Sequence, residues 1–201
     1  MSDRAAAPDS REREEAENLE QREFGFWLYL MSDAILFALL FAPYAVMTEG
    51  TAGGPSGQDV CDLGHVFVET MVLLCSSLTF GFAWLAAKEG QVSKVLTWLA
   101  VTFVLGLGFI GLELSEFAGM IAIGADPGRS GFLSAFFTLV GTHGLHVSFG
   151  LIFILVMAAQ IATRGLNPFV LSRLFRLGLF WHFLDIVWIG IFSVVYLPGL
   201  L

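Results

Sequence analysis

Charged residues are scarce in this chain. Only 14% of its 201 residues are Asp, Glu, Lys or Arg, whereas a soluble domain carries about 25%. Eight of the 18 acidic and four of the ten basic residues lie in residues 1–23, so the remainder is poorer in charge still. The net charge is −8 and the chain has no basic patch. A nucleic-acid-binding function, which needs such a patch, is therefore excluded.

Cysteine is scarcer still, with only Cys61 and Cys75 present. No CxxC, CxxCH or zinc-type spacing occurs, and paired cysteines for a binuclear copper site are missing. We expect no disulfide, because Cys61 lies in a polar loop and Cys75 in an apolar run. A nucleotide-binding glycine loop in its proper context is also missing. These absences exclude thiolate metal centres and nucleotide enzymes.

Long apolar runs fill most of the chain, with 56% hydrophobic residues and a mean hydropathy of +0.77. Five runs reach the length of about 20 residues that a helix needs to cross a bilayer. Short Gly- and Pro-containing loops separate them. The sequence predicts an all-α, polytopic membrane protein with a polar cytoplasmic tail (1–23) and a five-helix membrane domain (24–201). The expected spans are 24–48, 65–87, 95–123, 131–160 and 175–198.

Lysine and arginine predict the direction of these spans. Nine of them lie in the tail, the second loop and the fourth loop, whereas only Arg129 lies on the other side. Because cytoplasmic loops carry the excess of basic residues, the N-terminus is expected inside and the C-terminus outside. Four tryptophans near the expected inner ends agree with an aromatic belt.

Eight acidic and histidine residues lie within the expected spans and away from their edges, where each charge is costly and needs a reason. Six of these residues form three pairs, in "ELSE", "HGLH" and "HFLD". The two members of each pair are three residues apart and therefore share a helix face. Several helices thus offer polar groups to a common interior. The eight residues are Asp33, Glu69, Glu113, Glu116, His143, His146, His182 and Asp185.

These residues leave several interpretations open. His143 and His146 could ligate a metal or form hydrogen bonds across helices, and "HFLD" could be a proton relay or a structural pair. Asp33 could serve structure or proton handling. A diiron site needs Glu-x-x-His from two helices, and that motif does not occur. The residues alone fit an accessory subunit without a cofactor, or a small membrane transporter.

Small residues repeat at a spacing of four on two spans. Gly111, Ser115 and Gly119 lie on the third span, and Gly144 and Ser148 lie on the fourth. Such residues permit close helix approach in lipid. Both sets are therefore expected at helix contacts.

Four stretches resemble subunit III of the haem-copper respiratory oxidases: "GFWLYLMSDAILFALLFAPYAV", "TAGGPSG", "SGFLSAFFTLVGTHGLHVSFG" and "FWHFLDIVWIGIFSVVYL". The resemblance covers about residues 24–198. The mitochondrial form of this subunit has seven helices, and this chain resembles its last five. Within the family it is most similar to the bo-type ubiquinol oxidases, although a cytochrome c oxidase subunit remains the alternative.

The resemblance implies a noncatalytic subunit of a proton-pumping terminal oxidase in the bacterial inner membrane. It would hold no cofactor, because haem, copper and ubiquinone belong to subunit I. Its partners would be subunits I, II and IV and membrane phospholipid. Asp33 matches an acid that faces a lipid cleft, and with Glu69, Glu113 and Glu116 it is a candidate for proton or lipid contacts. His143, His146, His182 and Asp185 match an interhelical hydrogen-bond cluster.

Topology gives a first prediction. Cysteine labelling or reporter fusions should report the outer side at positions 58, 127 and 201, and the inner side at positions 10, 90 and 167. The expected cause is the distribution of basic residues. A result that requires an even number of crossings would contradict this orientation.

Overall fold

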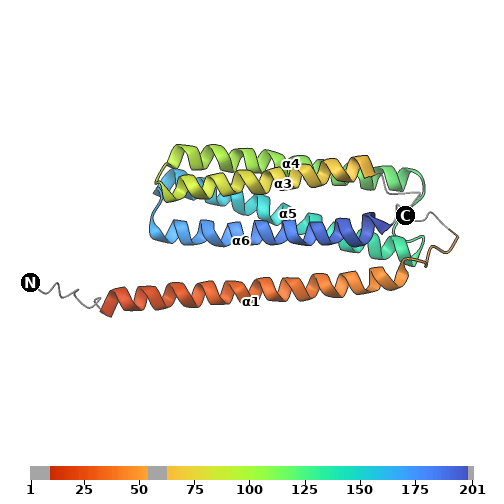
Figure 1. Ribbon diagram of the computed structural model, residues 1–201, viewed down its shortest axis with the longest axis horizontal. Coiled ribbons are helices and arrows are strands. Elements are labelled where there is room, and N and C mark those ends of the chain that lie inside the picture. Colours follow the sequence, from red (N-terminus) through yellow and green to blue (C-terminus); the bar gives the residue numbers. More distant parts are fainter. Residues whose placement is uncertain (1–9, 54–62, 199–201) are drawn as a thin grey trace, which may run out of the picture.

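Five long helices make up the computed structural model, which describes residues 10–53 and 63–198, with side chains from residue 21 (Figure 1). All five are long and apolar enough to cross a membrane, which confirms the predicted all-α, five-span architecture. A single π-helical turn, η1 (Phe192–Tyr196), follows the last helix. The helices are α1 (Ser10–Met47), α3 (Leu63–Lys88), α4 (Val92–Ala122), α5 (Gly131–Arg164) and α6 (Pro168–Ile191).

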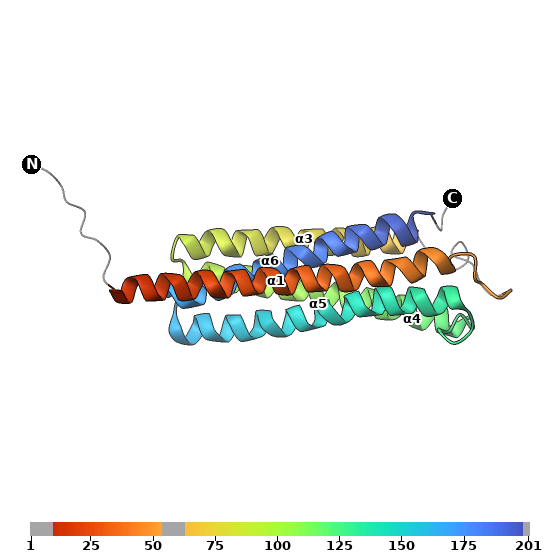
Figure 2. The same ribbon diagram turned by 90° about the horizontal axis from the view of Figure 1, so that it is seen from below.

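Four of the helices form a bundle, and α1 lies along one side of it (Figures 1 and 2). Chain neighbours pack together from α3 to α6, α3 also packs on α6, and α1 contacts α5 and α6. Helix α1 attaches through a narrow stripe of buried residues, Leu30, Asp33, Phe37 and Tyr44. Their spacing of three, four and seven keeps them on one helix face. From residue 24 onward, most of the other apolar side chains of α1 are exposed, as on a lipid-facing helix.

Two helix starts differ most from the predicted ones. Helix α6 begins at Pro168 rather than at 175, because the Asn167 side chain accepts a hydrogen bond from the Val170 N–H at 2.9 Å. An Asn cap followed by Pro is a favourable helix start. Helix α1 runs without a break from Ser10, so the polar segment before residue 24 continues the first span as helix.

Trp181 of α6 lies where α4 and α5 approach α6 closely. A Cβ atom at Gly106 of α4 would lie 3.0 Å from this indole, and one at Gly150 of α5 would lie 2.8 Å from it. Contacts below 3.0 Å require something to shift, and Trp181 is only 1% exposed. Glycine at these two positions therefore lets α4 and α5 close on α6.

The predicted small-residue contacts are right on one helix and wrong on the other within this chain. A Cβ atom at Gly144 would collide with the Glu113 carboxylate, so α4 and α5 do approach closely there. An added Cβ at Gly111 or Gly119 instead meets no atom of the described residues within 4 Å, apart from the adjacent backbone of α4 itself. Spacing shows that small residues share a face, but it does not show which face another helix covers.

Glycine substitutions give a second prediction. Gly150→Ala should destabilise the protein by about 1–3 kcal/mol, because the new methyl group overpacks against the indole of Trp181. Gly119→Ala is the control, since it adds the same methyl group in open space and should gain helix propensity. Thermal unfolding in detergent measures both. Equal unfolding temperatures for the two variants would contradict the packing described here.

Candidate functional site

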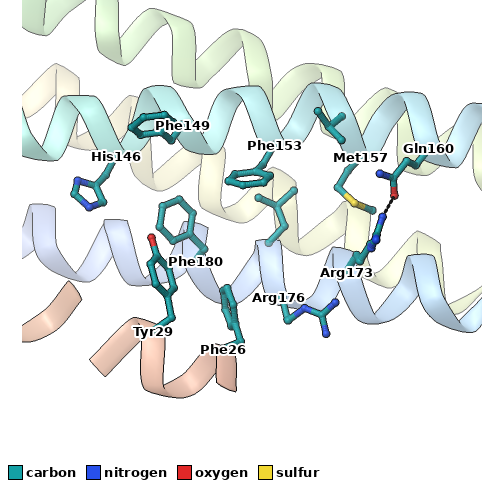
Figure 3. Close-up of a pocket in the computed structure, with 12 residues that line it drawn as sticks. Phe26, Tyr29, His146, Phe149, Phe153, Met157, Gln160, Arg173, Arg176 and Phe180 are labelled. Atoms are coloured by element: carbon teal, nitrogen blue, oxygen red, sulfur yellow. Dashed lines mark hydrogen bonds between the residues drawn. The ribbon is translucent and has the colours of Figure 1, made fainter. Parts of the chain in front are cut away.

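A cavity of about 670 Å³ lies between α1, α5 and α6 (Figure 3). Its walls are mostly aromatic and aliphatic. His146 and Tyr29 lie at one end, and Arg173 and Arg176 lie at the other. The lining residues are Phe26, Tyr29, His146, Phe149, Phe153, Val156, Met157, Gln160, Arg173, Arg176, Leu177 and Phe180.

Arg173 is held in place by two contacts at this end of the cavity. Its Nη1 donates a hydrogen bond to the Gln160 side-chain oxygen at 3.0 Å. Its guanidinium lies 4.2 Å above the ring of Phe169, a favourable cation–π arrangement. Arg173 and Arg176 are three residues apart and so point to the same side of α6. They form a cationic end to an otherwise apolar cavity.

Asp33 and His146 meet beside the opposite end of the cavity. The Asp33 Oδ2 lies 3.7 Å from the His146 Nε2, and Asp33 is only 7% exposed. The His146 Nδ1 lies 2.8 Å from the Thr142 carbonyl oxygen, so this nitrogen carries hydrogen and donates. In the neutral ring, Nε2 is then the acceptor. At 3.7 Å the separation is longer than a hydrogen bond, so the carboxyl and the imidazole are close neighbours across the contact between α1 and α5.

Glu69, Glu113 and Glu116 gather between α3 and α4, away from the pair formed by Asp33 and His146. Glu69 is fully buried and interacts electrostatically with both other acids. Its Oε1 lies 3.4 Å from the Nε2 of His65, one turn earlier on α3. Glu113 packs against Gly144, and Glu116 accepts a hydrogen bond from the Tyr196 hydroxyl at 3.0 Å. Asp33, which the sequence groups with these three acids as a candidate for proton or lipid contacts, lies apart from them beside His146.

His182 and Asp185 lie on a third part of the surface, beside α3. The His182 Nδ1 lies 2.6 Å from the Ser77 Oγ and 3.5 Å from the Asp185 Oδ2. Asp185 is buried, whereas 48% of the His182 side chain is exposed. This contact joins α6 to α3 by a hydrogen bond between side chains.

His143 is surrounded by aromatic rings. Its ring centroid lies 5.2 Å from that of Trp188, 5.8 Å from Phe109 and 6.3 Å from Phe37. Neither ring nitrogen has a hydrogen-bond partner among the described residues. The structure therefore does not bring His143, His146, His182 and Asp185 into one hydrogen-bonded cluster. His143 and His146 lie on α5 but point toward different neighbours on other helices. His143 contacts aromatic rings, whereas His146 lies beside the Asp33 carboxyl.

No group of three His, Cys, Asp or Glu side chains is arranged to hold a metal within residues 10–53 and 63–198. The acids and histidines instead lie in separate groups: Asp33 with His146, His182 with Asp185, and Glu69 with Glu113 and Glu116. Such groups can join neighbouring helices through polar contacts. Cys75 is a free, exposed thiol, and Cys61 lies outside the described residues.

Several polar contacts were not singled out from the sequence. The indole N–H of Trp181 donates to the Ser76 hydroxyl, and that of Trp188 donates to the Thr70 hydroxyl, each at 3.0 Å. The Ser77 hydroxyl likewise forms a hydrogen bond with the Nδ1 of His182. Their signal in the sequence is weak, because a Ser or Thr inside a span usually bonds only its own helix. The spacing of seven between the two tryptophans is the one available indication that they share a face.

The family model and the relatives that match this chain all describe the third subunit of a terminal oxidase. The family model described as cytochrome c oxidase subunit III matches residues 16–200. A cytochrome bo(3) ubiquinol oxidase subunit 3 from Pseudomonas aeruginosa is 59% identical over 178 residues, which are 89% of this chain and 85% of that protein. Its counterpart from Pseudomonas putida is also 59% identical, over 88% of this chain and 86% of that protein. A cytochrome c oxidase subunit 3 from Bacillus sp. PS3 is 44% identical over 97% of this chain and 93% of that protein.

These matches span nearly the whole chain, and the relatives are covered over most of their own length. They agree with the five membrane-spanning helices of the fold. The predicted resemblance to the third subunit of the haem-copper oxidases is thus confirmed. The chain belongs to the cytochrome c oxidase subunit III family and is a multi-pass inner-membrane subunit of a bacterial terminal oxidase.

Proposed function

We propose that this chain is a noncatalytic subunit of an oxidase that oxidises ubiquinol and reduces oxygen to water. The observation that carries the choice of donor is the 59% identity to two ubiquinol oxidase subunits over nearly nine-tenths of the chain. Its identity to the cytochrome c oxidase subunit is lower, at 44%. Haem, copper and ubiquinone are then bound by subunit I, and subunits I, II and IV are the partners.

Cytochrome c as the donor is the second candidate. It is favoured by the coverage of the Bacillus relative, which extends over 97% of this chain. A donor assay on the purified complex separates the two, because each assignment expects turnover with a different electron donor. The proposed assignment expects turnover with ubiquinol and none with cytochrome c.

A phospholipid is the proposed occupant of the cavity between α1, α5 and α6. The aromatic and aliphatic walls suit acyl chains, which gain by leaving contact with water and polar groups. Arg173 and Arg176 at one end suit a phosphate, because guanidinium groups bind phosphate oxygens through paired hydrogen bonds. Both arginines lie in the first turns of α6, toward the end of the span Pro168–Tyr196 at which a lipid head group is expected. The orientation derived from the basic residues makes this the inner leaflet.

Proton handling is the proposed role of Asp33. The carboxyl group contacts His146 at the edge of the cavity, and no Lys or Arg lies in the part of α1 beyond Arg22. A carboxyl and an imidazole this close can exchange a proton once side-chain motion brings them to hydrogen-bond distance. We assign this pair a supporting part in proton supply to the catalytic subunit. Glu69, Glu113 and Glu116 remain candidates for the same role nearer the outer end.

Asp33 gives a third prediction. Asp33→Asn preserves the shape and one hydrogen bond but cannot titrate, so assembly and the initial quinol oxidase rate should stay near wild type. Its effect should appear only at high pH or in the lifetime during turnover. Asp33→Leu should destabilise by about 1–3 kcal/mol, because His146 loses its partner in a buried site. Initial rates, turnover lifetimes and thermal stability of the complex measure these effects.

Ser32→Ala is the matched control for both Asp33 variants. Ser32 is the preceding residue, is exposed, and donates only to the Tyr29 carbonyl of its own helix at 2.7 Å. It should behave as wild type in all three measurements. Loss of most of the initial rate in Asp33→Asn at neutral pH would instead make this acid an obligatory proton carrier.

Removal of the subunit gives a fourth prediction and tests the proposed function directly. A complex stripped of this chain should keep its haem absorption bands and most of its initial oxidase rate, because the redox groups belong to other chains. It should lose activity sooner during turnover. Optical spectra and oxygen-consumption traces before and after re-addition of the chain provide the measurement. A haem signal that falls in proportion to the amount of this chain would refute the proposal.

A further inference from the structure

His182 lies at the middle of a membrane span and is nevertheless half exposed. It is 14 residues from each end of the span Pro168–Tyr196, or about 21 Å at the rise of an α-helix. Its side chain is 48% exposed on the outside of the bundle. At this depth, neither water nor lipid head groups reach a side chain, and the hydrocarbon supplies no hydrogen-bond partner.

One ring nitrogen of His182 is used within the chain, and the other is not. Nδ1 contacts the Ser77 Oγ at 2.6 Å and approaches Asp185 at 3.5 Å. Nε2 makes no hydrogen bond with any described residue, and neither oxygen of Asp185 accepts one. The imidazole therefore carries a donor or acceptor, depending on its tautomer, that faces out of the bundle.

Other polar side chains near the middle of a span are buried or form a hydrogen bond within their own helix. Thr102 and His143 are fully buried within the bundle. The Ser148 hydroxyl donates to the Gly144 carbonyl of its own helix at 2.9 Å. Each of them is thus removed from lipid or satisfied locally, as the cost of a polar group in hydrocarbon requires. The exposure of His182 breaks this rule within the isolated chain.

The surroundings of His182 form a continuous face on α3 and α6. Leu74 lies one turn from Ser77, and Ile186 lies one turn from His182; they are 38% and 68% exposed. This His182 face (Leu74, Ser77, His182, Ile186 and Ile189) is separate from the lipid-sized cavity. The cavity uses Phe180 of α6, and two residues along a helix turn the side chain by about 200°.

We propose that the His182 face binds a transmembrane helix of another subunit of the oxidase, whose side chain forms a hydrogen bond with the Nε2 of His182. A protein helix is the occupant because acyl chains cannot bond to an imidazole at this depth. The apolar rim of Leu74, Ile186 and Ile189 supplies the packing surface around the polar contact. The inference rests on the chain being an oxidase subunit and adds the face through which it assembles.

Photo-crosslinking in membranes that contain the assembled oxidase tests this face. A benzophenone amino acid replaces Ile186, and the matched control carries it at Val104 of α4, which is similarly exposed at 66%. The Ile186 site should give a protein adduct that mass spectrometry identifies as another subunit of the same oxidase, well in excess of the control. Lipid adducts alone at Ile186, or no excess over Val104, would overturn the proposal.

Variants of His182 test the hydrogen bond itself. His182→Gln retains a hydrogen-bonding group and should keep the chain in the complex during detergent purification. His182→Leu should dissociate about threefold to tenfold faster, as loss of one hydrogen bond implies. Retention of His182→Leu equal to wild type would overturn the proposal. Copurification of the tagged wild-type chain with the haem-bearing subunit is scored separately, because its failure would refute the proposed function rather than the face.

Discussion

Hydrocarbon offers no hydrogen-bond partners, and this constraint determines where the polar side chains of the bundle lie. Trp181 and Trp188 donate to Ser76 and Thr70 across the α3–α6 contact, and each hydroxyl donates in turn to a carbonyl of α3. The Tyr196 hydroxyl reaches Glu116 of α4. Such bonds are formed inside the bundle because no alternative exists outside it. They hold α6 at the centre of the fold.

Helix α6 consequently presents different chemistry on its different sides. One side contributes Arg173, Arg176 and Phe180 to the cavity beside α1. Another carries the buried tryptophans that join it to α3, and the outward side carries His182. A single helix thereby connects the proposed lipid site, the packed interior and the proposed subunit contact. Helix α1, which attaches by one stripe only, closes the cavity and brings Asp33 to His146.

The number and approximate extent of the spans could be predicted from the sequence, because an apolar run of sufficient length has few alternatives to a membrane helix. The pairing of Asp33 with His146 could not, since it depends on how α1 is rotated against α5. Rotation also explains why Gly119 faces outward and why His143 contacts only rings. The start of α6 was misplaced because its first residues include two arginines, although Asn167 and Pro168 are a recognisable cap. The oxidase family was predictable from local motifs, whereas the separate placement of the four His and Asp residues required the three-dimensional structure.

A high-resolution density map of the purified oxidase, with all subunits and native lipid, tests the central claim most directly. The claim is that the buried polar groups of this chain hold helices, lipid and protons and support redox chemistry located elsewhere. The map should place haem and copper in other chains, lipid near Arg173 and Arg176, and a neighbouring helix against His182. Metal or haem density coordinated by His143, His146 or His182 would contradict the account.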